Sequence, residues 1–202
     1  MKKIISSGAE AVIYLEGDQV IKTRLSKGYR IKEIDSKIIK RRTKAEIKIL
    51  KKASELTNVP KPEELKSENE IFIPYIEGDK LSEKLNSYVE ERQKEVMEKV
   101  GKEIGKLHEA GIIHGDLTTS NMILKENEVY IIDFGLGSLN GKYEQKGVDV
   151  HLLKQALEAK HFESCKKLFS WFKFGYGSID KSEAKKVFER LEEIERRGRY
   201  RH

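Results

Sequence analysis

The sequence predicts an α+β fold of two lobes: a small, β-rich N-terminal lobe with one long helix, and a minimal, mostly α-helical C-terminal lobe. Three observations indicate this division. Short apolar segments separated by turn residues fill the first 25 residues, one long helical pattern follows them, and helical periodicity dominates after residue 80. We therefore expect residues 1–76 to form the N-terminal lobe, 77–79 a hinge, 80–196 the C-terminal lobe and 197–202 a basic tail.

The composition bounds the class of protein. A chain of 202 residues can bury a sizeable core, and a charged fraction of 37% indicates a soluble protein. No apolar run approaches the ~20 residues that a membrane span needs, and the first apolar stretch is too short for a secretory signal. Cys165 is the only cysteine, which excludes an internal disulfide and a cysteine-based metal cluster, and the reducing interior of a cell is the expected setting.

The net charge of +6 is unevenly distributed along the chain. Residues 20–52 hold thirteen basic and three acidic residues, a local charge of +10, so the rest of the chain sums to −4. A second basic cluster ends the chain and includes Arg197, Arg199 and Arg201. Charged runs are usually solvated surfaces. Because two basic clusters lie on an otherwise acidic chain, a polyanionic partner, RNA above all, is an equally weighted alternative.

The first residues predict three strands joined by turns. The strands are Lys3–Ser6, Ala11–Leu15 and Gln19–Leu25, with Glu16-Gly17-Asp18 as the second turn. The first turn holds Gly8, Ala9, Glu10 and Ala11, whose small residues allow backbone N–H groups to approach phosphates. Because this turn lacks a glycine-rich pattern, an ordinary turn is the alternative.

A long helix follows, predicted from about Ser36 to Ser54 with Asp35 or Ser36 as its N-cap. Glu46 falls at the centre of the apolar stripe of this helix. An unpaired carboxylate buried there costs several kcal/mol, so it requires a cation. Lys22, in the middle of the third strand, is the predicted partner. The alternative is that Glu46 reaches solvent at the edge of the lobe.

The remaining elements are predicted from periodicity and turn residues. They are two strands at Val59–Leu65 (broken by Pro60 and Pro62) and Ile71–Ile76, a short helix at Lys80–Ser87, a long helix at Glu90–Ala110, and helices at Val148–Lys160, Phe162–Phe172 and Lys181–Arg197. A short polar loop, Leu136–Gly147, precedes the last three helices.

The segment from His114 to Gly135 contains the strongest functional pattern. It predicts a loop with Asp116 and Asn121, a hairpin of two short strands, and then Asp133. Since a hairpin brings its two ends together, Asn121 and Asp133 should meet there with Asp116 nearby. Two carboxylates and an amide oxygen suit Mg²⁺ held with substrate phosphates better than zinc. The alternative is a hairpin whose polar ends cap loops. His114 is expected to orient the loop through backbone bonds rather than to shuttle a proton.

The ordered set of Lys22, Glu46, Asp116, Asn121 and Asp133 resembles the protein-kinase superfamily over nearly the whole chain. Within it, the chain is most similar to the small atypical kinase/ATPase of the KEOPS complex, often called PRPK, a relative of the RIO kinases. The segments that carry this closer resemblance are 8–11, Lys22 with Arg24, Lys27, Tyr29 and Arg30, 42–46, 114–121, 147–149 and 197–199.

The resemblance implies a two-lobed kinase-like fold with ATP and Mg²⁺ as cofactors. It assigns nucleotide binding to Gly8, Ala9, Glu10, Ala11, Lys22 and Glu46, magnesium binding to Asn121 and Asp133, and catalysis to Asp116. An adenine ring would lie against the backbone of residues 74–77.

The resemblance also implies partners. They are a tRNA threonylcarbamoyltransferase, the other KEOPS subunits and tRNA, in a cytoplasmic assembly without a membrane. Family members hydrolyse ATP in the presence of the transferase and phosphorylate themselves on serine or threonine. Arg197, Arg199 and Arg201 are the predicted tRNA contacts.

Departures from conventional kinases narrow the expected reaction. Gly115 stands where those enzymes have Arg. Thr118 stands where serine/threonine kinases place a Lys. Such a Lys stabilises the charge of the transition state, a contribution commonly worth ~10²–10³ in rate. No Ala-Pro-Glu follows Gly135, so a platform for a peptide substrate is missing, and we expect water or a partner-bound group as the acceptor. Two other functions stay open: a small-molecule phosphotransferase of the aminoglycoside or choline kinase type, and a non-catalytic RNA-binding scaffold.

Overall fold

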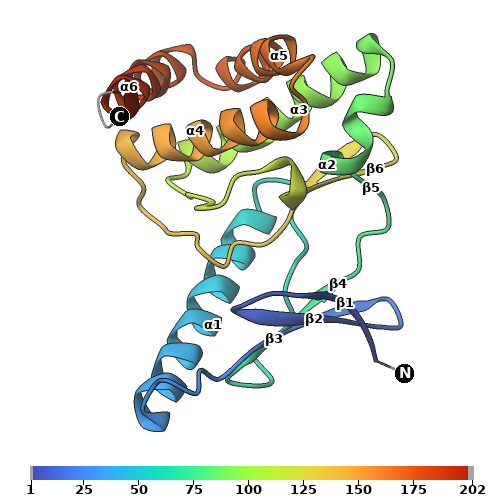
Figure 1. Cartoon of the computed structure of the whole chain (residues 1–202), viewed down its shortest axis with the longest axis vertical. Helices are drawn as coiled ribbons and strands as arrows, with labels where there is room; N and C mark the ends of the chain where they lie inside the picture. Colours follow the sequence, from blue (N-terminus) through green and yellow to red (C-terminus); the bar gives the residue numbers. More distant parts are fainter. Residues whose placement is uncertain (1, 200–202) are drawn as a thin grey trace.

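Four antiparallel strands form the N-terminal sheet in the computed structural model, which describes residues 2–199. Their order in the sheet is β1 (Lys3–Ser7), β2 (Ala11–Glu16), β3 (Gln19–Arg24) and β4 (Glu70–Pro74) (Figure 1). Gly17, in the predicted turn between β2 and β3, has a φ of +60°, which glycine adopts without strain. The three strands predicted for the first residues are confirmed to within one residue at each end.

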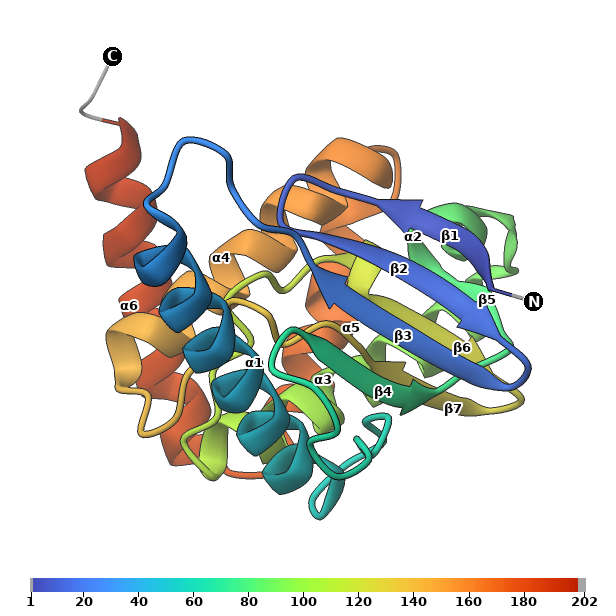
Figure 2. The ribbon, with the colours of Figure 1, turned by 90° about the horizontal axis from the view of Figure 1, so that it is seen from below.

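Helix α1 (Lys32–Ser54) lies beside this sheet (Figures 1 and 2). The predicted start of the helix is wrong, because α1 begins four residues earlier and its N-cap is Ile31. Asp35 lies inside the helix, where its carboxylate accepts hydrogen bonds from Ser26 Oγ at 2.7 Å and from the N–H of Lys27 at 3.0 Å. The carboxylate therefore fixes the preceding loop instead of capping the helix.

The rest of the chain forms a small second sheet and a group of helices. The sheet has the order β5 (Asp79–Lys80), β6 (Met122–Lys125) and β7 (Glu128–Ile131). The helices are α2 (Leu81–Lys84), the 3₁₀ turn Leu85–Ser87, α3 (Glu90–Glu109), the 3₁₀ turn Thr119–Asn121, α4 (Tyr143–Lys160), α5 (Cys165–Gly177) and α6 (Lys181–Arg199). This arrangement confirms the predicted α+β fold, with a small β-sheet region followed by a mostly helical one (Figure 1).

Helices α3 and α5 cross at very short distance because glycines lie at the contact. A Cβ atom at Gly101 would lie 2.2 Å from the carbonyl oxygen of Phe172, and one at Gly175 would lie 1.9 Å from that of Glu98. The core around this crossing contains Val96, Val100, Ile104 and Leu107 of α3. No helix in residues 2–199 is both long and apolar enough to cross a membrane.

Other predicted elements also differ from the structure; helix α5, for example, runs over Cys165–Gly177 instead of the predicted Phe162–Phe172. Residues 59–65 form no strand, because Pro60 and Pro62 lack the N–H groups that a ladder requires, and only the N–H of Glu63 bonds across, to Phe72 O at 2.9 Å. Helix α4 begins at Tyr143 rather than Val148, since the side chain of Gln145 accepts the N–H of Lys142 at 3.0 Å and caps the helix early. The loop after Gly135 is correspondingly shorter.

Candidate active site

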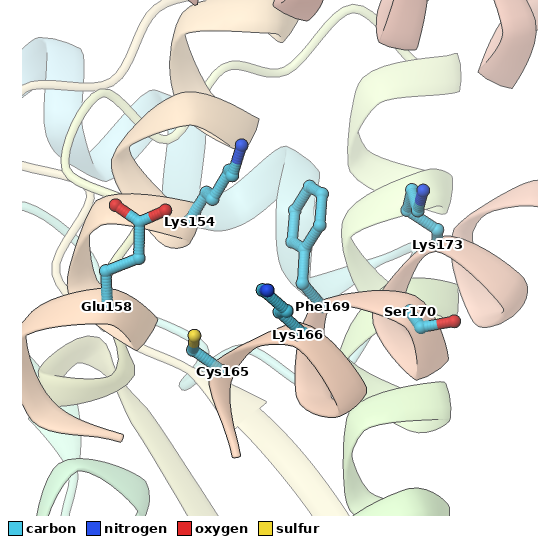
Figure 3. A pocket seen from close by; sticks show the side chains of 7 residues that line it. All are labelled: Lys154, Glu158, Cys165, Lys166, Phe169, Ser170 and Lys173. Carbon is cyan, nitrogen blue, oxygen red and sulfur yellow. The ribbon is translucent and has the colours of Figure 1, made fainter. Parts of the chain in front are cut away.

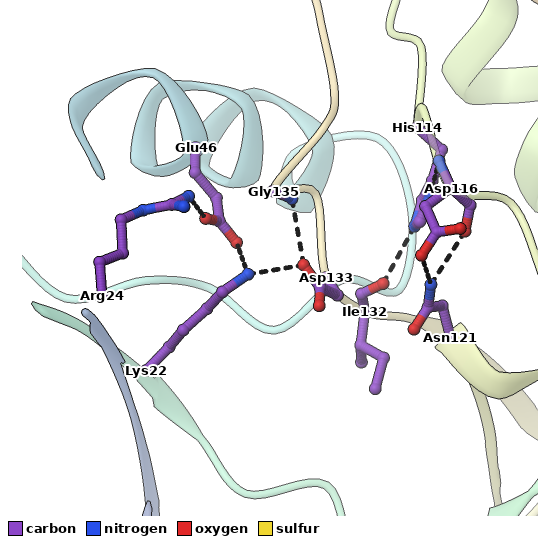
Figure 4. A network of polar contacts seen from close by, with 9 residues as sticks. All are labelled: Lys22, Arg24, Glu46, His114, Asp116, Asn121, Ile132, Asp133 and Gly135. Carbon is purple, nitrogen blue, oxygen red and sulfur yellow. Dashed lines mark hydrogen bonds and ion pairs between the residues drawn. The ribbon is translucent and has the colours of Figure 1, made fainter. Parts of the chain in front are cut away.

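Glu46 of α1 receives two cations from strand β3 (Figure 4). Lys22 Nζ lies 2.7 Å from Glu46 Oε1, which is the ion pair expected from the sequence, and the guanidinium of Arg24 bonds to Glu46 Oε2. Both carboxylate oxygens of Glu46 are therefore paired within the protein, and its side chain is only 2% exposed. Arg24 was missed as a partner, although it follows Lys22 by two residues and so shares its face of the strand.

Lys22 also contacts Asp133, which follows β7. Its Nζ lies 2.6 Å from Asp133 Oδ1, and the N–H of Gly135 donates to the same oxygen at 3.1 Å. Burial raises the pKa of Asp133, but the charge and bond of Lys22 outweigh it, so the pKa lies below its ordinary value and the group is ionised. Lys22 therefore connects the N-terminal sheet region, through Asp133, to the hairpin region.

The loop around Asp133 is tightly built. Asp133 has a φ of +64°, an uncommon conformation for a residue with a side chain, and such strain concentrates at functional sites. A Cβ atom at Gly135 would lie 3.0 Å from both Asp133 Oδ1 and Lys22 Nζ. Glycine at 135 thus leaves room for the ammonium group beside the carboxylate.

Asn121 and Asp116 lie together on the other side of this loop. The side-chain amide of Asn121 donates to the carbonyl oxygen of Asp116 at 2.9 Å and to Asp116 Oδ2 at 3.0 Å. The N–H of Ile132 donates to the carbonyl oxygen of Asn121 at 3.0 Å, which brings Asn121 to the residue that precedes Asp133. The two ends of the hairpin meet, as the sequence predicts.

The donor set fits a magnesium ion that is completed by phosphates. Within residues 2–199, neither Asn121 Oδ1 nor Asp133 Oδ2 accepts a hydrogen bond, and both residues line one cavity. No cluster of three or more histidine, cysteine or acidic side chains in this part of the chain could hold a metal by itself. Mg²⁺ typically takes one or two protein oxygens and fills its other positions with water and substrate phosphates.

A cavity of about 270 Å³ lies between the two sheets and reaches Lys22, Glu46, Asn121 and Asp133. Its apolar walls come from both sheets and include Ile13, Val20, Ile123 and Ile132. The segment 74–76, expected to face an adenine ring, also lines it. Asp116 and residues 8–11 do not line this cavity, although Ser6 does. The turn at 8–11 is instead closed by a bond from the N–H of Gly8 to Ala11 O at 3.0 Å.

His114 makes two hydrogen bonds to the backbone, as expected. Its Nε2 lies 3.0 Å from the carbonyl oxygen of Ile132, and its Nδ1 lies 3.2 Å from the N–H of Asp116. Nδ1 must accept the N–H of Asp116, so the ring is the neutral Nε2–H tautomer. Burial lowers the pKa of His114 below its ordinary value despite the opposing charge of Asp149, and this favours the same neutral form.

Asp149 of α4 anchors the loop that carries His114 and Asp116, a role that the sequence analysis did not predict. Its carboxylate accepts the N–H of His114 at 2.6 Å and that of Gly115 at 2.8 Å, and His108 Nε2 lies 3.3 Å from it. The residue is 1% exposed. A signal was present in the sequence, since Asp149 lies on the buried stripe of its helix with Leu153, four residues later, just as Glu46 does in α1.

Residues 197–199, the first half of the predicted basic tail, belong to helix α6. Arg197 belongs to α6, and its guanidinium lies 2.9 Å from Glu144 Oε1 and 3.4 Å from Glu193 Oε2. Arg199 is the last residue of α6. Arg201 lies outside the described residues. The positive charge of Arg197 is therefore partly neutralised.

A second cavity, of about 370 Å³, lies between α4 and α5 and contains none of the predicted site residues (Figure 3). Phe169, Cys165 and three lysines line it, together with Glu158. One of the lysines, Lys154, pairs with Glu195 Oε1 at 2.6 Å. Its positive charge is therefore compensated within the protein.

The sequence is similar to those of known kinase-like proteins. The family model of the RIO domain matches residues 14–137. The chain is 45% identical to the KEOPS complex subunit Bud32 of Pyrococcus abyssi, over 98% of this chain and 96% of that protein. It is 41% identical to a probable serine/threonine-protein kinase BUD32 homolog of Archaeoglobus fulgidus, over 96% of this chain and 94% of that protein.

A longer relative, a probable bifunctional tRNA threonylcarbamoyladenosine biosynthesis protein of Methanocorpusculum labreanum, is 43% identical over 96% of this chain. The chain spans only 35% of that protein. The match to the RIO model covers more than half of the chain, and the likeness to the Bud32 proteins covers nearly all of it. The chain therefore belongs to the RIO domain family and, within it, to the Bud32 group of kinase-like proteins.

Proposed function

We propose that this chain is the ATP-dependent kinase or ATPase subunit of a cytoplasmic KEOPS-type assembly that supports threonylcarbamoyladenosine modification of tRNA. One observation carries the catalytic part: Lys22 lies between Glu46 and Asp133 at the wall of a cavity that spans both sheets. The assembly part is supported by the relatives, which are named as a KEOPS subunit and as a tRNA threonylcarbamoyladenosine biosynthesis protein.

The nucleotide would bind in the cavity of about 270 Å³. Tyr75 donates its N–H to Asp18 O at 2.8 Å and Pro74 has no N–H, so of the residues 74–76 that line the cavity, Ile76 offers the N–H that could meet an adenine ring. Lys22 would contact the phosphates, while Glu46 holds its ammonium group in place. The turn at 8–11 lies outside the lining of this cavity and the N–H of Gly8 is bonded to Ala11 O, so the phosphate contact expected of residues 8–11 stays a prediction.

Asn121 and Asp133 would hold Mg²⁺ through Asn121 Oδ1 and Asp133 Oδ2, and the ion would neutralise charge on the phosphates. Asp116 would orient or deprotonate the attacking water or hydroxyl, a contribution often worth ~10²–10⁴ in rate. The amide of Asn121 holds Asp116 Oδ2 at 3.0 Å, which leaves the other carboxylate oxygen to accept the proton.

The segment after Gly135 supports water or a partner-bound group as the acceptor. Ile113 and Ser138 exchange two backbone hydrogen bonds, of 2.9 and 3.0 Å, and Gly141 donates its N–H to Gly111 O at 2.9 Å. These bonds tie the short segment down against the loop that leads to Asp116. A tied segment of this length offers no extended surface for a peptide.

The small-molecule phosphotransferase alternative is less well supported. Those enzymes carry an additional substrate lobe, whereas the described residues after 142 form three helices, α4, α5 and α6. These helices pack on one another and α5 packs on α3, so they complete the core instead of enclosing a second substrate.

The test is ATP turnover by the purified chain alone, with the transferase subunit, and with tRNA added. We expect turnover to rise when the transferase is present, and Asp133→Asn to reduce the stimulated rate at least about 10²-fold, because the metal loses a charged ligand. The matched control is Glu192→Gln, an exposed acid on α6. A folded Asp133→Asn protein with the rate of the control would contradict the proposal.

A further inference from the structure

Helix α1 carries nine basic residues, and the structure divides them into two groups. Three of them form ion pairs with acids outside the helix: Lys40 with Glu68, Arg42 with Glu10, and Lys51 with Glu64. The other six are exposed and make no ion pair within residues 2–199; they are Lys32, Lys37, Arg41, Lys44, Lys48 and Lys52. Ion pairs within the protein therefore account for only three of the nine basic residues of this helix.

Five of the unpaired cations lie on one line. Lys37, Arg41, Lys44, Lys48 and Lys52 are spaced by four, three, four and four residues. At 3.6 residues per turn they fall within an arc of about 80° and extend over about 22 Å of the helix. We call these five residues the outer stripe. Like charges three and four residues apart repel and destabilise a helix, so within the stripe only Lys52, in the last turn, is favourable to the helix itself.

The outer stripe faces away from the nucleotide cavity. Glu46 lies about 160° around the helix from the centre of the stripe, because 3.6 residues make one turn. Ile49, Leu50 and Ala53 are buried, whereas every residue of the stripe is exposed. Figure 1 shows α1 along one margin of the molecule. A ligand on the stripe would therefore leave the cavity open.

We propose that the outer stripe of α1 binds the phosphate backbone of a structured RNA. A row of Lys and Arg residues without asparagine, glutamine or aromatic side chains contacts phosphates rather than base edges, so binding would be independent of sequence. A helix that lies on a membrane needs an apolar face to insert, but the apolar face of α1 is buried in the protein. The choice of RNA among polyanions rests on the proposed function. The existence of the basic surface rests only on the exposed, unpaired side chains of the outer stripe.

The experiment compares two double variants with the same change in charge on the same helix. Lys44→Gln with Lys48→Gln removes two cations of the outer stripe, and Lys40→Gln with Lys51→Gln removes two that are paired with glutamates. Binding of a fluorescently labelled tRNA to the purified chain is followed by anisotropy between about 50 and 200 mM salt, a range over which phosphate contacts weaken strongly.

We expect the stripe variant to lower the slope of log K against log salt by about 2, one unit for each lost phosphate contact, and to weaken binding at low salt at least tenfold. The control variant should change the slope by less than half of that. Equal losses in the two variants, or no binding of tRNA by the unaltered chain, would overturn the proposal. Equally tight binding of an acidic polypeptide or of phosphatidylserine vesicles would overturn the choice of RNA.

Nucleotide binding separates this proposal from the proposed function. Lys44 and Lys48 do not line the nucleotide cavity, so the stripe variant should bind Mg²⁺ and ATP as the unaltered chain does. If the stripe variant binds tRNA as the unaltered chain does while partner-stimulated ATP turnover persists, the proposed RNA-binding role of the outer stripe is wrong and the proposed function stands. If turnover is absent but the stripe binds tRNA, the function is wrong and the surface stands.

Discussion

Two buried carboxylates, Glu46 in α1 and Asp149 in α4, occupy the same kind of position and are satisfied in different ways. Each lies on the apolar stripe of a helix and is at most 2% exposed. Glu46 is paired with side-chain cations, Lys22 and Arg24, whereas Asp149 accepts backbone N–H groups from His114 and Gly115. A cation on a flexible side chain can turn to a second partner, as Lys22 does towards Asp133, but backbone N–H groups cannot.

The comparison indicates a division of labour. Asp149 fixes the conformation of the loop that carries Asp116, so its loss should be felt first as a loss of folding. Glu46 positions a cation that would contact the nucleotide, so its loss should be felt first as a loss of activity. The predictions below test this difference, starting with the largest expected effect.

Asp149→Ala should lower the free energy of unfolding by about 2–5 kcal/mol, because the N–H groups of His114 and Gly115 lose their acceptor and each unsatisfied buried group costs about 1–3 kcal/mol. Urea denaturation followed by circular dichroism measures the change. The control is Val148→Ala, an exposed neighbour on the same helix that should cost little. A cost for Asp149→Ala no larger than that of the control would show that the backbone bonds do not hold the loop.

Glu46→Gln should lower partner-stimulated ATP turnover about 10²-fold, a loss of about 2.7 kcal/mol in transition-state stabilisation, because the ammonium group of Lys22 is no longer held by a charge. The amide keeps one acceptor oxygen, for Lys22 or for Arg24, so the free energy of unfolding should fall less than in Asp149→Ala. Glu33→Gln, on the exposed first turn of the same helix, is the control. The comparison fails if Glu46→Gln destabilises the protein more than Asp149→Ala while turnover is preserved.

The smallest effect concerns pH. The pKa of His114 in the folded protein lies below its unfolded value of about 6.5, so the unfolded state takes up the proton first and stability falls as pH drops below about 6.5. Protonation of Nδ1 would also break its bond with the N–H of Asp116. Between pH 7.5 and 5.5, the unaltered chain should lose more unfolding free energy than His114→Gln does. Identical losses in the two proteins would remove His114 as the cause.

Much of the site could be predicted because its parts obey local rules. A carboxylate on an apolar helix stripe requires a partner, which is how the pair of Glu46 and Lys22 was predicted, and a hairpin must bring Asn121 to the residue before Asp133. Helix boundaries were predicted less well. The helix starts at Lys32 and Tyr143 depend on long-range packing and on side-chain bonds that propensity does not contain.

Other features follow from the three-dimensional arrangement and could not be predicted. The sequence contains thirteen basic residues between 20 and 52, but only the structure separates the cations that face glutamates from those of the outer stripe. The neutralisation of Arg197 by Glu144 likewise depends on the packing of α6 against α4. The sequence places Asp149 on a buried helix stripe, as it does Glu46, but only the structure identifies its partners, the backbone N–H groups of His114 and Gly115.

The most direct test of the central claim is calorimetric titration with a non-hydrolysable ATP analogue, with and without Mg²⁺. The account places Lys22, Asn121 and Asp133 at one nucleotide–metal site, so Mg²⁺ should tighten binding to the unaltered chain and to the Glu192→Gln control. In Asp133→Asn the effect of Mg²⁺ should be lost, although the analogue still binds. An equal effect of Mg²⁺ on both variants, or no binding to the unaltered chain, would contradict the account.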